Sequence, residues 1–127
     1  MVSTNKQPEG EDRSLVIEYL ELLVVLDLLQ DNLDIIQSSN LRLTQVFEVH
    51  LITLMDSVTE ELTQVRKSMR TRGIKIIEEG RKMGQTYAKY LCRGYTRESG
   101  ILDGVMQART EERLAQHLRI DLSKIKR

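Results

Sequence analysis

The first long run of apolar residues covers positions 15–29, where twelve of the fifteen residues are apolar. At 100° per residue the acidic positions in and after this run do not fall on one side, so no face is polar along the whole length. We therefore predict a helix over residues 13–38, with Asp12 or Ser14 as its N-cap, that must be covered on more than one side. The preceding residues lack a hydrophobic pattern and predict a flexible N-terminal tail over residues 1–12.

A second set of apolar residues recurs at spacings of three and four over more than six helical turns. We predict this second helix over residues 41–72, because Gly73 follows a basic run suited to a helix C-terminus. The short turn at residues 38–40 predicts that the two helices pack antiparallel. A capping-box sequence at residues 57–60 leaves a break near residue 57 as an alternative. The recurring residues are Phe47, Leu51, Leu54, Val58, Leu62, Val65 and Met69.

The periodicity changes after Gly73. Residues 74–77 are β-prone and residues 86–95 alternate between two faces, with Gly80 and Gly84 in a turn between them. These features predict a β-hairpin over residues 74–95 that leans on the helices, because an isolated hairpin is marginal in water. A short helix is the alternative reading of the second half, since three of its residues also fit helical spacing.

A helical stripe returns near residue 99 and predicts a third helix over residues 99–118. The predicted fold class is therefore mainly α: a long antiparallel helical hairpin plus a third helix, with a small β-hairpin between helices two and three. A length of 127 residues suits one domain, which we place at residues 13–127 after the tail.

Cysteine usage and hydropathy predict a cytoplasmic protein. Cys92 is the single cysteine, so no disulfide can form within the chain. The polar N-terminus has no apolar core of a signal peptide. The most apolar run is shorter than the roughly 20 residues that a bilayer requires, and acidic residues interrupt it, so we expect no contact with a membrane.

The net charge is zero, but the charges are unevenly distributed. Residues 1–63 contain twelve acidic and three basic residues, a net charge of −9. Residues 64–98 contain ten basic and three acidic residues, a net charge of +7. Because a local field can steer a partner even when the whole molecule is neutral, this asymmetry matters more than the total.

The sequence contains no recognisable catalytic or metal-binding motif. His50 has no acidic, cysteine or histidine residue at helical spacing, and His117 has only Asp121. Cys92 lies beside Arg93, which could lower the pKa of a thiol, but a small apolar residue on the inner face of the hairpin is the better interpretation. We therefore predict that the protein is not an enzyme and uses no metal, cofactor or small-molecule substrate.

The apolar excess of the first helix predicts self-association. One hairpin partner cannot cover so much apolar surface, and symmetric dimers are the commonest soluble oligomers. We therefore expect a homo-oligomer, with a dimer favoured and the first helix at its centre. The candidate interface residues are Leu22, Leu23, Val24, Leu26 and Leu29.

Two functions fit these features. The favoured one is a non-enzymatic interaction or regulatory protein that contacts an unknown protein partner through helical surfaces. The alternative is a nucleic-acid-binding regulator, because the basic segment 64–98 interleaves cations with tyrosines that could stack on bases. We rank it second, since the acidic half of the chain also needs basic partners. The residues that could contact nucleic acid or an acidic partner are Arg70, Arg72, Lys75, Arg81, Lys82, Tyr87, Lys89, Arg93, Tyr95 and Arg97.

Overall fold

The computed structural model describes residues 3–119 and 121–124, with side chains placed for residues 10–119 and 121–123. Three α-helices and a three-stranded antiparallel sheet form the fold, and the strand order is β1-β2-β3. The elements in chain order are α1 (Ser3–Gln37), α2 (Thr44–Thr71), β1 (Ile74–Lys82), β2 (Gln85–Cys92), β3 (Tyr95–Leu102), α3 (Asp103–Leu118) and the short 3-10 helix η1 (Leu122–Lys124).

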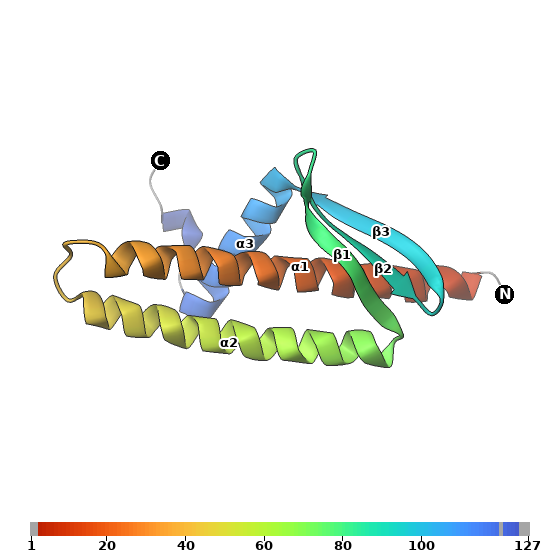
Figure 1. Cartoon of the computed structure of the whole chain (residues 1–127), viewed down its shortest axis with the longest axis horizontal. Coiled ribbons are helices and arrows are strands. Elements are labelled where there is room, and N and C mark those ends of the chain that lie inside the picture. Colours follow the sequence, from red (N-terminus) through yellow and green to blue (C-terminus); the bar gives the residue numbers. More distant parts are fainter. Residues whose placement is uncertain (1–2, 120, 125–127) are drawn as a thin grey trace.

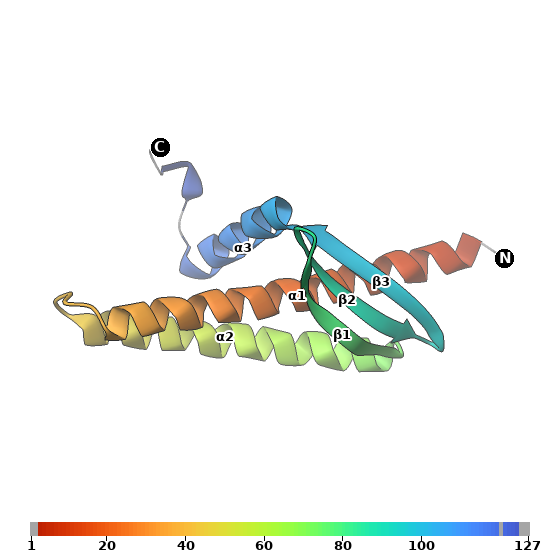
Figure 2. The same ribbon diagram turned by 45° about the horizontal axis from the view of Figure 1, so that its top comes forward.

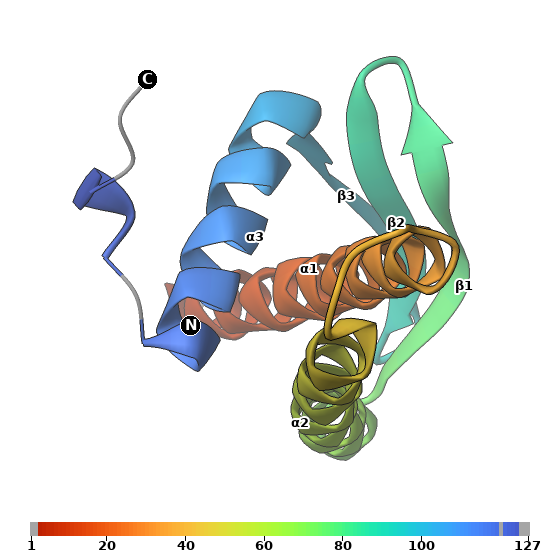
Figure 3. The ribbon, with the colours of Figure 1, turned by 90° about the vertical axis from the view of Figure 1, so that its left-hand side faces the viewer.

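Helices α1 and α2 form a long antiparallel hairpin (Figure 1). The sheet crosses α1 toward the end of the hairpin where the chain begins, and α3 crosses α1 nearer its middle (Figure 2). Seen along the hairpin, α1 has α2 beneath it and α3 and the sheet on its two flanks (Figure 3). The loop that joins α1 to α2, with the adjoining turns of both helices, projects beyond α3 and the sheet (Figure 1). We call this part, residues 35–52, the closed end of the hairpin.

The predicted fold class is wrong in its β structure. The β structure does lie between α2 and α3, but it is a three-stranded sheet rather than a two-stranded hairpin. Residues 95–102, assigned to the hairpin's end and the third helix, form β3 instead. The cause is a second two-residue turn at Arg93 and Gly94, whose positive φ angles of 49° and 90° match the type I′ turns that suit β-hairpins. The first such turn is at Met83 and Gly84.

The first helix also begins earlier than predicted. Residues 3–12, expected to be a flexible tail, belong to α1. Asp12 is therefore not an N-cap but a residue inside the helix, and its side chain is completely buried. Its charge is satisfied by the arginines that directly follow α2 and β2, which tie this part of α1 to the rest of the fold.

The core lies where α1 meets its three neighbours. On α2 the predicted stripe is confirmed over most of its length, and no break occurs near residue 57. The alternation along β2 is confirmed as well, because even-numbered residues from Thr86 to Cys92 are buried and the odd-numbered ones are not. Gly73 ends the α2 segment with a φ of 73°, as expected. The buried residues of α2 are Leu54, Val58, Leu62, Val65 and Met69.

Candidate functional site

A buried carboxylate accounts for part of the basic segment. Asp12 Oδ1 accepts a hydrogen bond from Arg72 Nε at 2.7 Å, and Asp12 Oδ2 accepts one from an Arg93 terminal nitrogen at 2.6 Å. The Cys92 thiol donates to the same Oδ2 at 3.0 Å. Burial alone would raise the pKa of Asp12, but the hydrogen bonds from Arg93, Cys92 and Arg72 outweigh it and lower this pKa to about 2. Arg72 and Arg93 are therefore structural residues that fasten α1 to α2 and the sheet.

The same cluster affects the pKa and the burial of the Cys92 thiol. Burial raises the pKa of its thiol, and the hydrogen bond to Asp12 raises it further. The thiol is 2% exposed and lies on the inner face of β2. This placement confirms that Cys92 serves as a small buried residue, and the expected effect of Arg93 on the thiol is outweighed.

A second group of charges attaches α3 to the hairpin. Glu21 on α1 is 3% exposed and accepts hydrogen bonds from Arg109, at 2.7 Å, and from Arg113. Arg113 also contacts Glu61 of α2 at 3.1 Å, and His117 Nε2 lies 2.7 Å from the same carboxylate. Burial would lower the pKa of Arg113, but Glu21 holds it above its usual value. His117 thus contacts Glu61 rather than Asp121.

The outer face of the sheet carries charges of both signs. Lys89 lies on β2 between Glu78 of β1 and Glu98 of β3 in the strand register. Lys82 pairs with Glu98 at 3.2 Å and lies over the ring of Tyr87, whose hydroxyl donates to Glu78. The sheet surface is therefore a mixed network rather than a continuous positive patch.

The remaining basic candidates are dispersed. Arg81 pairs with Asp103 at 2.8 Å, and Arg97 is half-buried on the inner face of β3, opposite Tyr90. Within the described part of the chain, no ion pair involves Arg70 or Lys75, which lie on α2 and β1. Tyr95, at the start of β3, is 70% exposed. The structure does not bring these side chains together at one site.

The interface candidates of the first helix occupy two environments. Leu22 and Leu29 are buried in the core of the chain itself, at 0% and 2% exposure, and cannot meet a second copy there. Leu23, Val24 and Leu26 are partly buried against the same core. The apolar excess of α1 is therefore largely covered by α2, α3 and the sheet.

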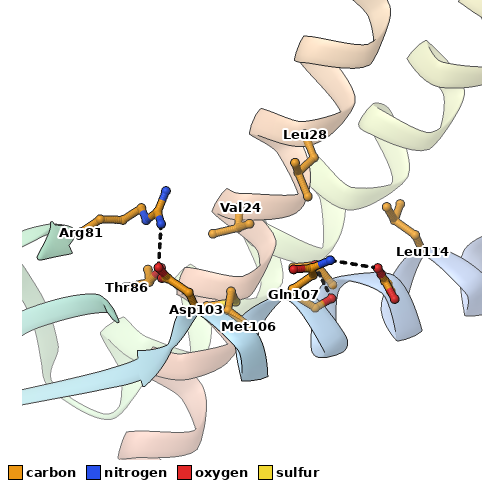
Figure 4. A pocket seen from close by; sticks show the side chains of 10 residues that line it. Val24, Leu28, Arg81, Thr86, Asp103, Met106, Gln107 and Leu114 are labelled. Carbon is orange, nitrogen blue, oxygen red and sulfur yellow. Dashed lines mark hydrogen bonds and ion pairs between the residues drawn. The ribbon is translucent and has the colours of Figure 1, made fainter. Parts of the chain in front are cut away.

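Val24 lines an open groove between α1 and α3, with a volume of about 410 Å³ (Figure 4). Its apolar wall includes Val24, Leu28 and Met106, and the Arg81–Asp103 ion pair closes one end. Among the described residues, no three His, Cys, Asp or Glu side chains lie close enough to hold a metal ion.

The largest accumulation of exposed apolar side chains is at the closed end of the hairpin. Leu43 is 74% exposed, and Val46 and Val49 are 63% and 62% exposed. Phe47, which the apolar spacing predicted in the core stripe, is 48% exposed because the hairpin extends beyond α3 and the sheet. The sequence contained one indication of this exposed surface, because several apolar residues of α2 lie outside its core stripe. The exposed apolar residues of the closed end are Ile35, Leu41, Leu43, Val46, Phe47, Val49 and Ile52.

Acidic side chains accompany these apolar ones. Glu48, Ile52 and Asp56 follow one another at a spacing of four, so two carboxylates flank Ile52 along one row of α2. Asp31 likewise precedes Ile35 by four residues on α1. Residues 27–56 contain five acidic residues and one arginine. No described residue forms an ion pair with any of these carboxylates, which belong to Asp27, Asp31, Asp34, Glu48 and Asp56.

Among the described residues, no helix combines the length and the hydropathy that a membrane span requires. Searches of curated proteins and of solved structures found no match. A family model described as YhjD protein matches residues 7–122, which includes all three strands, α2, α3 and most of α1. The chain therefore belongs to the YhjD protein family.

Proposed function

We propose that this protein is a non-enzymatic interaction protein that binds a protein partner through the closed end of its helical hairpin. The observation that carries the proposal is the exposure of seven large apolar residues there. An exposed group of apolar side chains of this size is characteristic of interaction sites, because isolated surface residues are common but a large concentration is costly in water. These residues are not part of the packed core, since the closed end extends beyond the elements that cover α1.

A homodimer remains a prediction, but its interface cannot lie where the sequence predicted it. The apolar excess of the first helix predicted that this helix lies at the centre of the dimer, but Leu22 and Leu29 are buried within one chain. Self-association would have to use other surfaces that are exposed, and the groove beside Val24 is a candidate.

The nucleic-acid alternative has less support. Ion pairs within the chain hold Arg72, Arg81 and Arg93. Lys82 likewise forms an ion pair with Glu98. A phosphate backbone would have to compete with these carboxylates for the same cations. We expect weak or no binding to labelled duplex or single strands, even at low salt, in a fluorescence anisotropy titration. Submicromolar binding at physiological salt that is lost in an Arg81→Glu, Lys82→Glu variant would place nucleic acid first.

The proposal is tested by the size of the assembly in native cell extract. The wild-type chain, expressed at its natural level, is expected to elute in size-exclusion chromatography ahead of the purified protein. The closed-end variant, Val46→Ser, Val49→Ser, Ile52→Ser, is expected to elute with the purified protein. The matched control is Ile77→Ser, which removes an equally exposed apolar side chain from β1 and should leave the assembly intact. An unchanged elution of the closed-end variant contradicts the proposal.

A further inference from the structure

We infer that the occupant of the closed end is a basic amphipathic helix of another protein. The inference rests on the proposed function and adds the chemical class of the partner. Its first support is the spacing of the exposed apolar residues. The exposed residues Val46, Val49 and Ile52 recur every three positions on the first turns of α2. A helix presents apolar residues at the matching spacing, so it can pack alongside α2 as helices do in a bundle.

The second support is charge. The closed end and its adjoining turns carry five carboxylates without an ion-pair partner among the described residues, against one arginine. Glu48 and Asp56 flank Ile52 on α2, and Asp31 lies one turn from Ile35 on α1. A partner helix with lysine or arginine beside its apolar stripe would place cations against these carboxylates as its apolar residues are buried.

The same charges disfavour two other occupants. A second copy of the chain would bring an identical acidic surface against the first, and like charges in contact oppose association. A lipid surface with anionic headgroups would repel the five carboxylates, whereas lipid-binding helices carry basic residues beside their apolar face. The helix dipoles do not alter this balance, because the C-terminus of α1 and the N-terminus of α2 lie together at the closed end and offset one another.

The size of the occupant follows from the surface. The exposed part of α2 between Thr44 and Asp56 is about 18 Å long, at roughly 1.5 Å per residue. A helix of about 18 residues would cover it and reach the loop. The probe is therefore a fluorescein-labelled 18-residue peptide with leucine at the apolar heptad positions and lysine at the others. Two companion peptides are needed: one with glutamate in place of every lysine, and one with the lysine peptide's composition in scrambled order.

Binding is measured by fluorescence anisotropy with the full chain. We expect the lysine peptide to bind at least 10-fold more tightly than the glutamate peptide and the scrambled peptide. The closed-end variant should lose at least 10-fold in affinity for it, and Ile77→Ser should not. A charge variant, Asp31→Asn, Glu48→Gln, Asp56→Asn, should lose affinity at 0.05 M salt and differ little from wild type at 0.5 M, where screening is strong.

Several results would overturn the inference. Equal binding of the scrambled peptide would mean general attraction between charges, and equal binding of the glutamate peptide would remove charge complementarity. Sedimentation equilibrium showing a dimer that the closed-end variant loses would assign the surface to a second copy. Binding to phosphatidylglycerol vesicles, lost in that variant, would assign it to a membrane. If no peptide binds but the assembly in cell extract still depends on the closed end, the inference fails and the proposed function stands. If that assembly is also unaffected, both fail.

Discussion

At the scale of single residues, Asp12 connects the most distant parts of the chain. Its carboxylate receives Arg72, Arg93 and the Cys92 thiol while it is fully buried. A buried charge is stable only when its hydrogen bonds are complete, and removing one partner leaves the others unsatisfied. The carboxylate therefore stabilises the packing of α1 against α2 and the sheet.

We expect Asp12→Asn to lower the free energy of unfolding by about 2 kcal/mol, because Arg72 and Arg93 would lose their buried counter-charge. Urea unfolding followed by circular dichroism measures the change. The matched control is Glu11→Gln, since Glu11 pairs with the same Arg72 at 2.7 Å but is 67% exposed. An exposed pair is worth about 0.5 kcal/mol, so the control should be nearly neutral. Equal losses in the two variants would contradict the assigned role of burial.

The stabilisation by Asp12 should depend on pH. Its pKa is about 2 in the folded chain against an ordinary value of 3.8. Because the folded pKa is the lower one, the stabilisation is complete above the ordinary value and is lost as the pH falls toward 2. The difference in unfolding free energy between wild type and Asp12→Asn should therefore be constant from about pH 7 to 5 and decrease by about 2 kcal/mol between pH 4 and 2. A difference that does not change with pH would show that folding leaves the pKa of Asp12 at its ordinary value, which would contradict the stabilisation of its charge.

At the scale of elements, the hydrophobic periodicity of the sequence predicted the residues of each element that pack against the core. The buried stripe from Leu54 to Met69 and the alternation along β2 were both visible in the sequence. The start of α1 was not, because residues 3–12 lack an amphipathic pattern and Asp12 is held by residues 60 and 81 positions away. The sequence did not predict β3 because Gly94 is the one turn residue between β2 and β3. An arginine such as Arg93 does not by itself indicate a positive φ.

The candidate site was harder to predict than the fold. Periodicity cannot tell where a stripe leaves the core, so Phe47 appeared equivalent to Leu54 although their exposures are 48% and 8%. That difference depends on how far α3 and the sheet extend along the hairpin. In the same way, Arg72 and Arg93 appeared available to a partner, because their ion pairs join residues distant in sequence.

Two arginines of α3 bind Glu21 of α1, and this attachment can be tested separately. We expect Glu21→Gln to destabilise α3 by about 2 kcal/mol, because Arg109 and Arg113 lose a carboxylate that is 3% exposed. Hydrogen exchange of the α3 amides should accelerate by at least 10-fold while the core turns of α1 and α2 keep their protection. The matched control, Glu112→Gln on the exposed face of α3, should leave exchange unchanged. Uniform acceleration in all three helices would mean that α3 does not open separately.

At the scale of the whole molecule, the chain has two structurally different ends. One end of the hairpin is braced by the sheet, α3 and the two charge clusters centred on Asp12 and Glu21. The closed end projects beyond α3 and the sheet (Figure 1). Its exposed side chains include seven large apolar residues. This division explains why substitutions at the closed end should affect binding and leave stability within about 0.5 kcal/mol at each position.

Site-specific photo-cross-linking in the native cells tests whether a protein partner binds at the closed end. A benzophenone amino acid replaces Val49 at the closed end or, as the control, Ile77 on β1, and adducts are identified by mass spectrometry. We expect a discrete protein adduct from position 49 that disappears when Val46→Ser and Ile52→Ser are added, and no such adduct from position 77. Equal cross-linking from both positions, or an adduct from position 77 alone, would contradict the assignment of the closed end as the binding surface.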